Sequence, residues 1–117
     1  MNPQLEILLE IQDLKTQRKE LEVTERQVEE EVFHMSVDDA LRQLDEKIVE
    51  MEESLAPPVR SRYRRISGRH PRVVVPVIAG TCYGCFVNIP TAVASDAERN
   101  REISHCENCG RFLYLVG

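Results

Sequence analysis

The chain has 117 residues with a net charge of −5, and its aromatic residues are three Phe, three Tyr and no Trp. This length allows one ordinary domain or two very small ones, and so few bulky side chains argue against a large single core. The charged N-terminus contains no apolar run of signal-peptide or membrane-spanning length, which predicts a cytoplasmic protein with no membrane insertion.

The charge is divided between two halves of the chain. Residues 1–55 contain 16 acidic and 6 basic residues, net −10, whereas residues 56–117 contain 4 acidic and 9 basic residues, net +5. The composition changes at the Ala-Pro-Pro of residues 56–58. We therefore expect two parts in an α+β protein: a helical hairpin over residues 1–66, kinked near 56–58, and a small β domain over residues 67–117.

The acidic half has the periodicity of a coiled coil. Apolar residues recur at alternating spacings of four and three, which is typical of an antiparallel or intermolecular seam. The first seam contains Ile7, Ile11, Leu14, Leu21, Val28, Val32 and Met35, with Arg18 and Glu25 as polar interruptions, and the second contains Val37, Leu41, Leu44, Ile48, Met51 and Leu55. A two-helix hairpin leaves part of its seam exposed, which favours a protein partner or a homodimer.

A break between the two seams is expected at Ser36. Serine is a good N-cap, and Asp39 then stands at the third position of the second helix, where the helix dipole favours an acid. This break would place Asp38 and Asp39 at the tip of an antiparallel hairpin. The acids are either plain helix-start residues or contacts for a partner that receives the tip.

Pro57 and Pro58 interrupt the second helix and also suit the first turn of a new one. Val59, Tyr63 and Ile66 keep the four-and-three spacing, so a short helix or a kinked continuation is expected to end at Ser67 and Gly68. The return arm over residues 37–66 would then match the length of the first arm over residues 4–34.

Residues 60–72 carry a cluster of arginines around one tyrosine. Such a group can follow phosphates and stack bases, which makes RNA a candidate ligand. The acidic hairpin opposes nucleic acid, and arginines of this kind also solvate a helix or pair with nearby acids. The candidate contact residues are Arg60, Arg62, Tyr63, Arg64, Arg65, Arg69 and Arg72.

The pattern after Gly68 is that of short strands with two Cys-x-x-Cys pairs between them. Residues 72–78 are β-branched, and Pro76 within them predicts an edge strand. Each cysteine pair is expected in a tight turn at a strand end, where Gly84 and Gly110 tolerate unusual backbone angles.

The spacing C-x2-C-x20-C-x2-C predicts one tetrahedral metal site formed by Cys82, Cys85, Cys106 and Cys109. Four thiolates favour one structural Zn²⁺ per chain, since no position remains open for water. Iron in a rubredoxin-like site is the main alternative, although the first pair is followed by Phe86 where such a site has glycine. His105 is not expected to be a metal ligand, although it is next to Cys106. We find no catalytic arrangement and expect no enzyme.

Three segments resemble the C-terminal zinc ribbon of a bacterial four-cysteine zinc-ribbon, coiled-coil family, which includes proteins of the FlgZ and CdsZ kind. They are "RSRYRRISGR", "VVVPVIAGTCYGCFVNIP" and "ISHCENCGRFLY", within residues 55–115. The resemblance implies a noncatalytic adaptor whose partners are flagellar or type III secretion components, a sigma factor or RNA. A hairpin beside a four-cysteine module is also similar to DksA-type regulators, which would imply RNA polymerase as the partner of Asp38 and Asp39.

Overall fold

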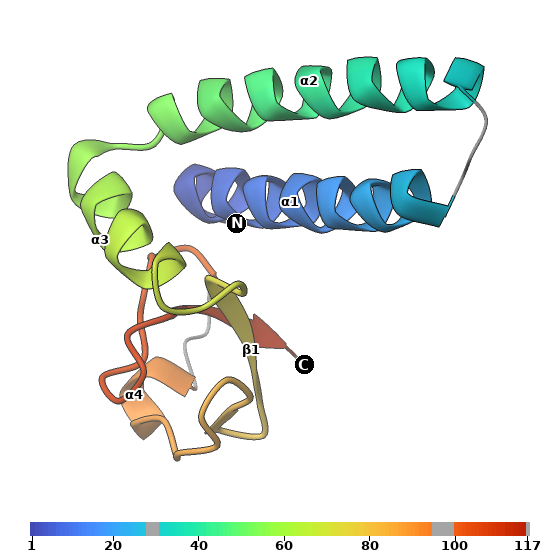
Figure 1. Ribbon diagram of the computed structural model, residues 1–117. Helices are drawn as coiled ribbons and strands as arrows, with labels where there is room; N and C mark the ends of the chain where they lie inside the picture. Colours follow the sequence, from blue (N-terminus) through green and yellow to red (C-terminus); the bar gives the residue numbers. More distant parts are fainter. Residues whose placement is uncertain (28–30, 95–99, 117) are drawn as a thin grey trace.

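The structure is a computed structural model that describes residues 1–27, 31–94 and 100–116. Two long helices lie side by side, a short helix leads away from them, and a small sheet follows, as the predicted α+β class requires (Figure 1). The elements are α1 (Pro3–Gln27), α2 (Glu31–Glu53), α3 (Pro57–Ser67), β1 (Val74–Ile78), β2 (Thr81–Cys82), α4 (Thr91–Ala94) and β3 (Phe112–Val116). None of the described helices is long and apolar enough to cross a membrane.

The hairpin connection differs from the prediction. Helix α1 ends at Gln27 and α2 begins at Glu31, so the break expected at Ser36 is wrong, and Val28 of the predicted seam lies outside the described residues. Asp38 and Asp39 lie about two turns inside α2 rather than at its start. The reason is that a serine cap is worth only about 1 kcal/mol, and each residue added to a helix gains a backbone hydrogen bond.

Helix α3 does not extend the return arm. The break at Pro57 and Pro58 and the new helix ending near Gly68 are confirmed, but α3 turns off the end of α2 toward the sheet (Figure 1). The matched arms expected over residues 4–34 and 37–66 are therefore wrong. Arg60 explains the turn, because its guanidinium donates to the carbonyls of Glu52, Glu53 and Leu55 at 3.3, 2.7 and 2.8 Å and so satisfies the C-terminal end of α2.

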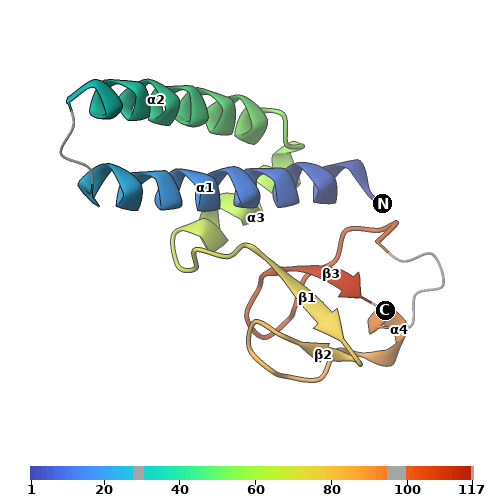
Figure 2. The ribbon, with the colours of Figure 1, turned by 90° about the vertical axis from the view of Figure 1, so that its right-hand side faces the viewer.

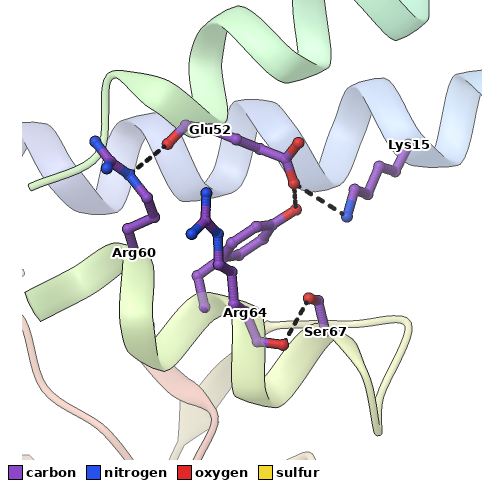
Figure 3. A network of polar contacts seen from close by, with 6 residues as sticks. Lys15, Glu52, Arg60, Arg64 and Ser67 are labelled. Carbon is purple, nitrogen blue, oxygen red and sulfur yellow. Dashed lines mark hydrogen bonds and ion pairs between the residues drawn. The ribbon is translucent and has the colours of Figure 1, made fainter. Parts of the chain in front are cut away.

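A polar network ties the three helices together. The Glu52 carboxylate of α2 accepts a hydrogen bond from the hydroxyl of Tyr63 at 2.5 Å and pairs with Lys15 of α1 at 3.7 Å, the second contact being drawn in Figure 3. The Lys15 ammonium also lies 4.9 Å from the centre of the Tyr63 ring. Tyr63 is only 2% exposed, and its burial, together with the Glu52 hydrogen bond, raises the pKa of the phenol. The network holds α3 at a defined angle to the hairpin.

One hydrophobic core joins the helices to the sheet. Leu5, Leu8 and Ile11 from the first turns of α1 are at most 1% exposed. Leu5 and Leu8 are outside the predicted seam, because this part of α1 is covered on more than one side. The shared core consists of Leu5, Leu8, Ile11, Ile48, Leu55, Tyr63, Ile66, Val73, Val74 and Phe112. The predicted boundary between residues 66 and 67 therefore runs through a common core.

The sheet has the strand order β2-β1-β3, with β1 antiparallel to β2 and parallel to β3. Strand β1 is therefore central, and the edge position predicted from Pro76 is wrong. The proline is tolerated because β2 pairs only with Val77 and Ile78, while the Pro76 carbonyl still accepts the amide of Tyr83 at 3.0 Å. Figure 2 shows the sheet under the N-terminal half of α1, with the other end of the hairpin projecting past it.

Side chains from outside the sheet complete its backbone hydrogen bonds. The side-chain oxygen Oε1 of Gln12 accepts hydrogen bonds from the backbone amides of Val73 and Val74 at 2.8 and 2.9 Å. Its side-chain nitrogen Nε2 donates to the backbone carbonyl of Val74 at 3.2 Å. The Asn100 side chain likewise accepts a hydrogen bond from the Leu115 amide at 2.7 Å and donates one to the Leu115 carbonyl at 3.1 Å. Helix α1 is thus attached to the sheet by a polar contact as well as by the core.

Gln12 provides a direct test of this attachment. Changing Gln12→Ala leaves three partly buried backbone groups without their partner, so the free energy of unfolding is expected to fall by about 2–4 kcal/mol. The measurement is chemical denaturation followed by circular dichroism. Gln17→Ala is the matched control, because the Gln17 side chain bonds only to Asp13 on the exposed side of α1. Equal stability of the two variants would contradict the attachment.

Candidate metal centre

Four cysteines converge at one end of the sheet. Their sulfur atoms all lie within 4.8 Å of one another, with Cys82 Sγ 3.9 Å from Cys109 Sγ and Cys85 Sγ 3.6 Å from Cys106 Sγ. Four sulfurs at about 2.3 Å around a tetrahedral zinc would lie about 3.8 Å apart. All four cysteines are free thiols rather than disulfides. The donor set therefore has the chemistry and spacing of a Zn²⁺ site.

The two Cys-x-x-Cys turns are built alike. In the first, the Phe86 amide donates to the Cys82 carbonyl at 2.7 Å and the Cys82 amide donates to the Val87 carbonyl at 2.9 Å. In the second, the Gly110 amide donates to the Cys106 carbonyl at 2.8 Å and the Cys106 amide donates to the Arg111 carbonyl at 2.9 Å. Each turn therefore presents its two sulfurs in the same way, and the two turns together enclose one site.

The turns differ at the residue after the second cysteine. Gly110 has φ +79°, as glycine readily allows, but Phe86 has φ +62°, a conformation that costs a residue with a side chain about 1–2 kcal/mol. Gly84 does not take a positive φ, so the backbone role predicted for it is wrong. It is needed for space, since a Cβ there would lie 3.0 Å from the Val75 side chain and 3.1 Å from the Arg111 guanidinium.

The aromatic side chains of the first turn lie on the surface. Phe86 is 70% exposed and Tyr83 is 46% exposed, and their ring centres are 5.5 Å apart. The first turn therefore combines an unfavourable backbone angle with an exposed apolar ring. In the sequence, Phe86 stands where a rubredoxin-like site has glycine, and this departure is the local signal for the feature.

The protonation of the cysteines is coupled to the binding of a cation. A hydrogen bond from the Asn108 side chain lowers the pKa of Cys85 to about 6, whereas burial raises the pKa of Cys109 to about 12 and also raises that of Cys82. Without a cation the four sulfurs would not all be thiolates at neutral pH. A divalent metal would displace the remaining protons as it binds.

The surroundings of the cysteines separate a buried side from an exposed side. Cys82 and Cys106 are at most 1% exposed, and Cys85 and Cys109 are half-buried. The buried side is closed by a second hydrophobic cluster that contains Val75, Val77, Ile89, Leu113 and Leu115. His105 is exposed and is not among the metal-binding groups that converge in the described part of the chain.

The predicted arginine contacts separate into different environments. The Arg60 guanidinium donates hydrogen bonds to backbone carbonyls at the C-terminal end of α2, and the Tyr63 side chain is buried. The predicted surface contact therefore does not hold for either residue. Arg64 is exposed, and Arg72 lines a groove beside Leu9 and Gln12 of α1. The remaining three gather beside the metal site, around a cavity of about 160 Å³ lined by Arg62, Arg65, Ile66, Arg69, His70, Cys109 and Gly110.

Comparison with known proteins supports the metal assignment. Residues 81–113 match the family model of the C4-type zinc ribbon domain, a segment that contains all four cysteines. No curated protein sequence matches the chain. The prediction of a zinc ribbon is confirmed, while the finer resemblances to FlgZ, CdsZ and DksA stay predictions.

Two solved structures are similar in fold. HP0958 from Helicobacter pylori CCUG 17874 has a TM-score of 0.60 and 24% identity, covering 74% of this chain and 37% of that one. CT398 from Chlamydia trachomatis has a TM-score of 0.55 and 25% identity, covering 70% of this chain and 35% of that one. The chain thus spans little more than a third of either protein. The geometry, the thiolate ligands and the family match together assign residues 81–113 as a C4 zinc ribbon with one Zn²⁺.

Proposed function

We propose that the protein is a noncatalytic, zinc-binding adaptor that acts in the cytoplasm and presents a helical hairpin to protein partners. The observation that carries the proposal is the shared core, in which the ribbon packs against the first turns of α1. The ribbon thereby holds the hairpin at one end, and the other end projects past the sheet (Figure 2). A rigid, projecting, charged hairpin suits binding between proteins.

The metal chemistry supports a structural role for zinc. Four cysteine ligands complete a tetrahedral site and leave no position for a water or substrate. Among the described residues, the cluster behind the metal contains seven buried residues, two of which are the ligands Cys82 and Cys106. A core of this size is too small to fold unaided, and a structural zinc can supply the missing free energy.

The partners are expected to be secretion or flagellar components, as the family resemblance implies. The polymerase alternative requires acids at the tip of the hairpin. Asp38 and Asp39 instead lie along α2, where the Asp39 carboxylate accepts hydrogen bonds from Arg42 and Gln43 of the same helix. These contacts favour a role in helix stability, so the adaptor has more support.

The zinc assignment predicts one Zn²⁺ per chain in protein purified under reducing conditions without chelator. Cys106→Ser should abolish stoichiometric zinc, disorder the ribbon and also lower the melting temperature of the helices, because Val73, Val74 and Phe112 belong to the core shared with α1. Elemental analysis and circular dichroism provide the measurements.

A neighbouring residue supplies the control for the metal. His105→Ser, next to a ligand but outside the cluster, should keep both zinc and stability. Iron as the main metal, or an ordered ribbon in protein without any metal, would contradict the assignment. Unchanged helix melting in Cys106→Ser would show that the hairpin is independent of the ribbon.

The adaptor proposal is tested by affinity purification from the native cell, with and without nuclease. We expect a protein partner that remains bound after nuclease treatment. Recovery of RNA alone, lost with nuclease, would contradict the proposal and favour the nucleic-acid alternative.

The variant Asp38→Asn with Asp39→Asn separates the adaptor from a polymerase regulator. As an adaptor, the protein should lose at most about 0.5 kcal/mol of stability, since the ion pair of Asp39 with Arg42 is exposed. In vitro transcription with a matched polymerase should show no effect of either form. A wild-type effect that the double variant loses would promote the polymerase alternative.

A further inference from the structure

Three arginines form a basic row beside the metal site. Arg62 and Arg65 lie on α3 and Arg69 follows its end, at spacings of three and four residues that place them along one side. They line the cavity next to Cys109 and Gly110. No acidic group in the described part of the chain forms an ion pair with any of the three. We call these residues the arginine row.

Phe86 is an exposed apolar side chain of the same zinc ribbon. It follows Cys85 as Gly110 follows Cys109, and these two cysteines are the half-buried pair of the site. Its ring is 70% exposed although its backbone angle is one that glycine would adopt more easily. An exposed aromatic side chain held in an unfavourable conformation is characteristic of a contact surface.

The outer side of α2 carries the opposite charge. Glu46, Glu50 and Glu53 are exposed and follow one another at helical spacings of four and three, and Val49 between them is itself 51% exposed. Of these acids only Glu50 has an ion pair in the described part of the chain, with Lys47 at 3.4 Å. We call this surface the acidic face. It combines negative charges with one exposed apolar side chain.

The two surfaces cannot meet within one molecule. The buried residue Ile48 belongs to the core that α2 shares with α1, and the acidic face lies on the other side of α2. Figure 1 shows α1 between α2 and the ribbon, whereas the arginine row lies where α3 meets the ribbon. Any contact between the row and the face therefore joins two different molecules.

We propose that the arginine row and Phe86 of one copy bind the acidic face of α2 of a second copy. The charges support this, because residues 1–55 carry net −10 and residues 56–117 carry net +5. The acidic hairpin would repel a nucleic acid that approached the row, and the same hairpin attracts the row of another copy. The contact joins unlike surfaces, so it either closes into a two-fold pair with two such contacts or continues as an open chain. This self-association goes beyond the proposed adaptor function.

Charge exchange between the two surfaces tests the proposal. Arg65→Glu with Arg69→Glu reverses the row, and Glu46→Lys with Glu53→Lys reverses the face, all at exposed positions. Sedimentation velocity should show association of the wild type at low salt, weakened about tenfold or more at high salt. Each reversed variant alone should be monomeric. An equimolar mixture should associate again, because the reversed row of one variant meets the reversed face of the other, and the remaining row and face keep their wild-type charges.

Two further variants separate the surfaces from general charge effects. Arg64→Glu makes the same kind of change on α3 at an exposed position outside the row, and should leave association unchanged. Phe86→Gly removes the ring and relieves the positive φ, so it should weaken association about tenfold while leaving the ribbon at least as stable.

Three results would overturn the proposal. In the first, the wild type stays monomeric at low salt up to about 100 μM. In the second, the mixture of the two reversed variants does not associate. In the third, the wild type does not self-associate but binds a labelled oligo(U), and reversal of the arginine row abolishes that binding. The last result would assign the row to nucleic acid. These measurements use the purified chain alone, so they are independent of whether the adaptor partner is found.

Discussion

The first turns of α1 are enclosed by α2, α3 and the sheet, and this burial fixes how the helices and the sheet are arranged. Leu5, Leu8 and Ile11 share one core with residues of α2, α3 and the sheet, and Gln12 completes the backbone hydrogen bonds of β1. Because this helix end must be covered on several sides, α3 cannot continue along the hairpin. It turns instead toward the sheet, where Arg60 satisfies the carbonyls that the turn exposes at the end of α2.

Zinc and the shared core act on opposite sides of the same small sheet. Val75 and Val77 belong to the cluster beside the cysteines, while the neighbouring Val74 belongs to the core beneath α1. Alternation along a strand makes this division possible, since successive side chains point to opposite faces. A metal bound by the four cysteines would therefore hold the strand that packs beneath α1, and we expect the position of the hairpin to depend on it.

The fold places the negatively charged and the positively charged surfaces on different sides of the molecule. The acidic face lies on the outer side of α2, and the arginine row lies where α3 meets the ribbon. The turn of α3 is what places the row beside the metal site, near Cys109 and Gly110. Phe86 adds an exposed ring in the first Cys-x-x-Cys turn, where the second turn has Gly110. Recognition through these surfaces requires no catalytic group, which agrees with an adaptor.

Features that depend on local chemistry could be predicted from the amino-acid sequence. Two complete Cys-x-x-Cys pairs predicted the metal and its ligands, because thiolate chemistry and turn geometry are set within a few residues. Pro57 and Pro58 predicted the end of one helix and the start of another, since proline lacks the amide that a helix interior needs. Four features could not be predicted in this way: the burial of Leu5 and Leu8, the direction of α3, the central place of β1 and the interior position of Asp38 in α2. Each of these depends on contacts between distant parts of the chain, whose combined free energy exceeds a local preference of about 1 kcal/mol such as the cap expected at Ser36.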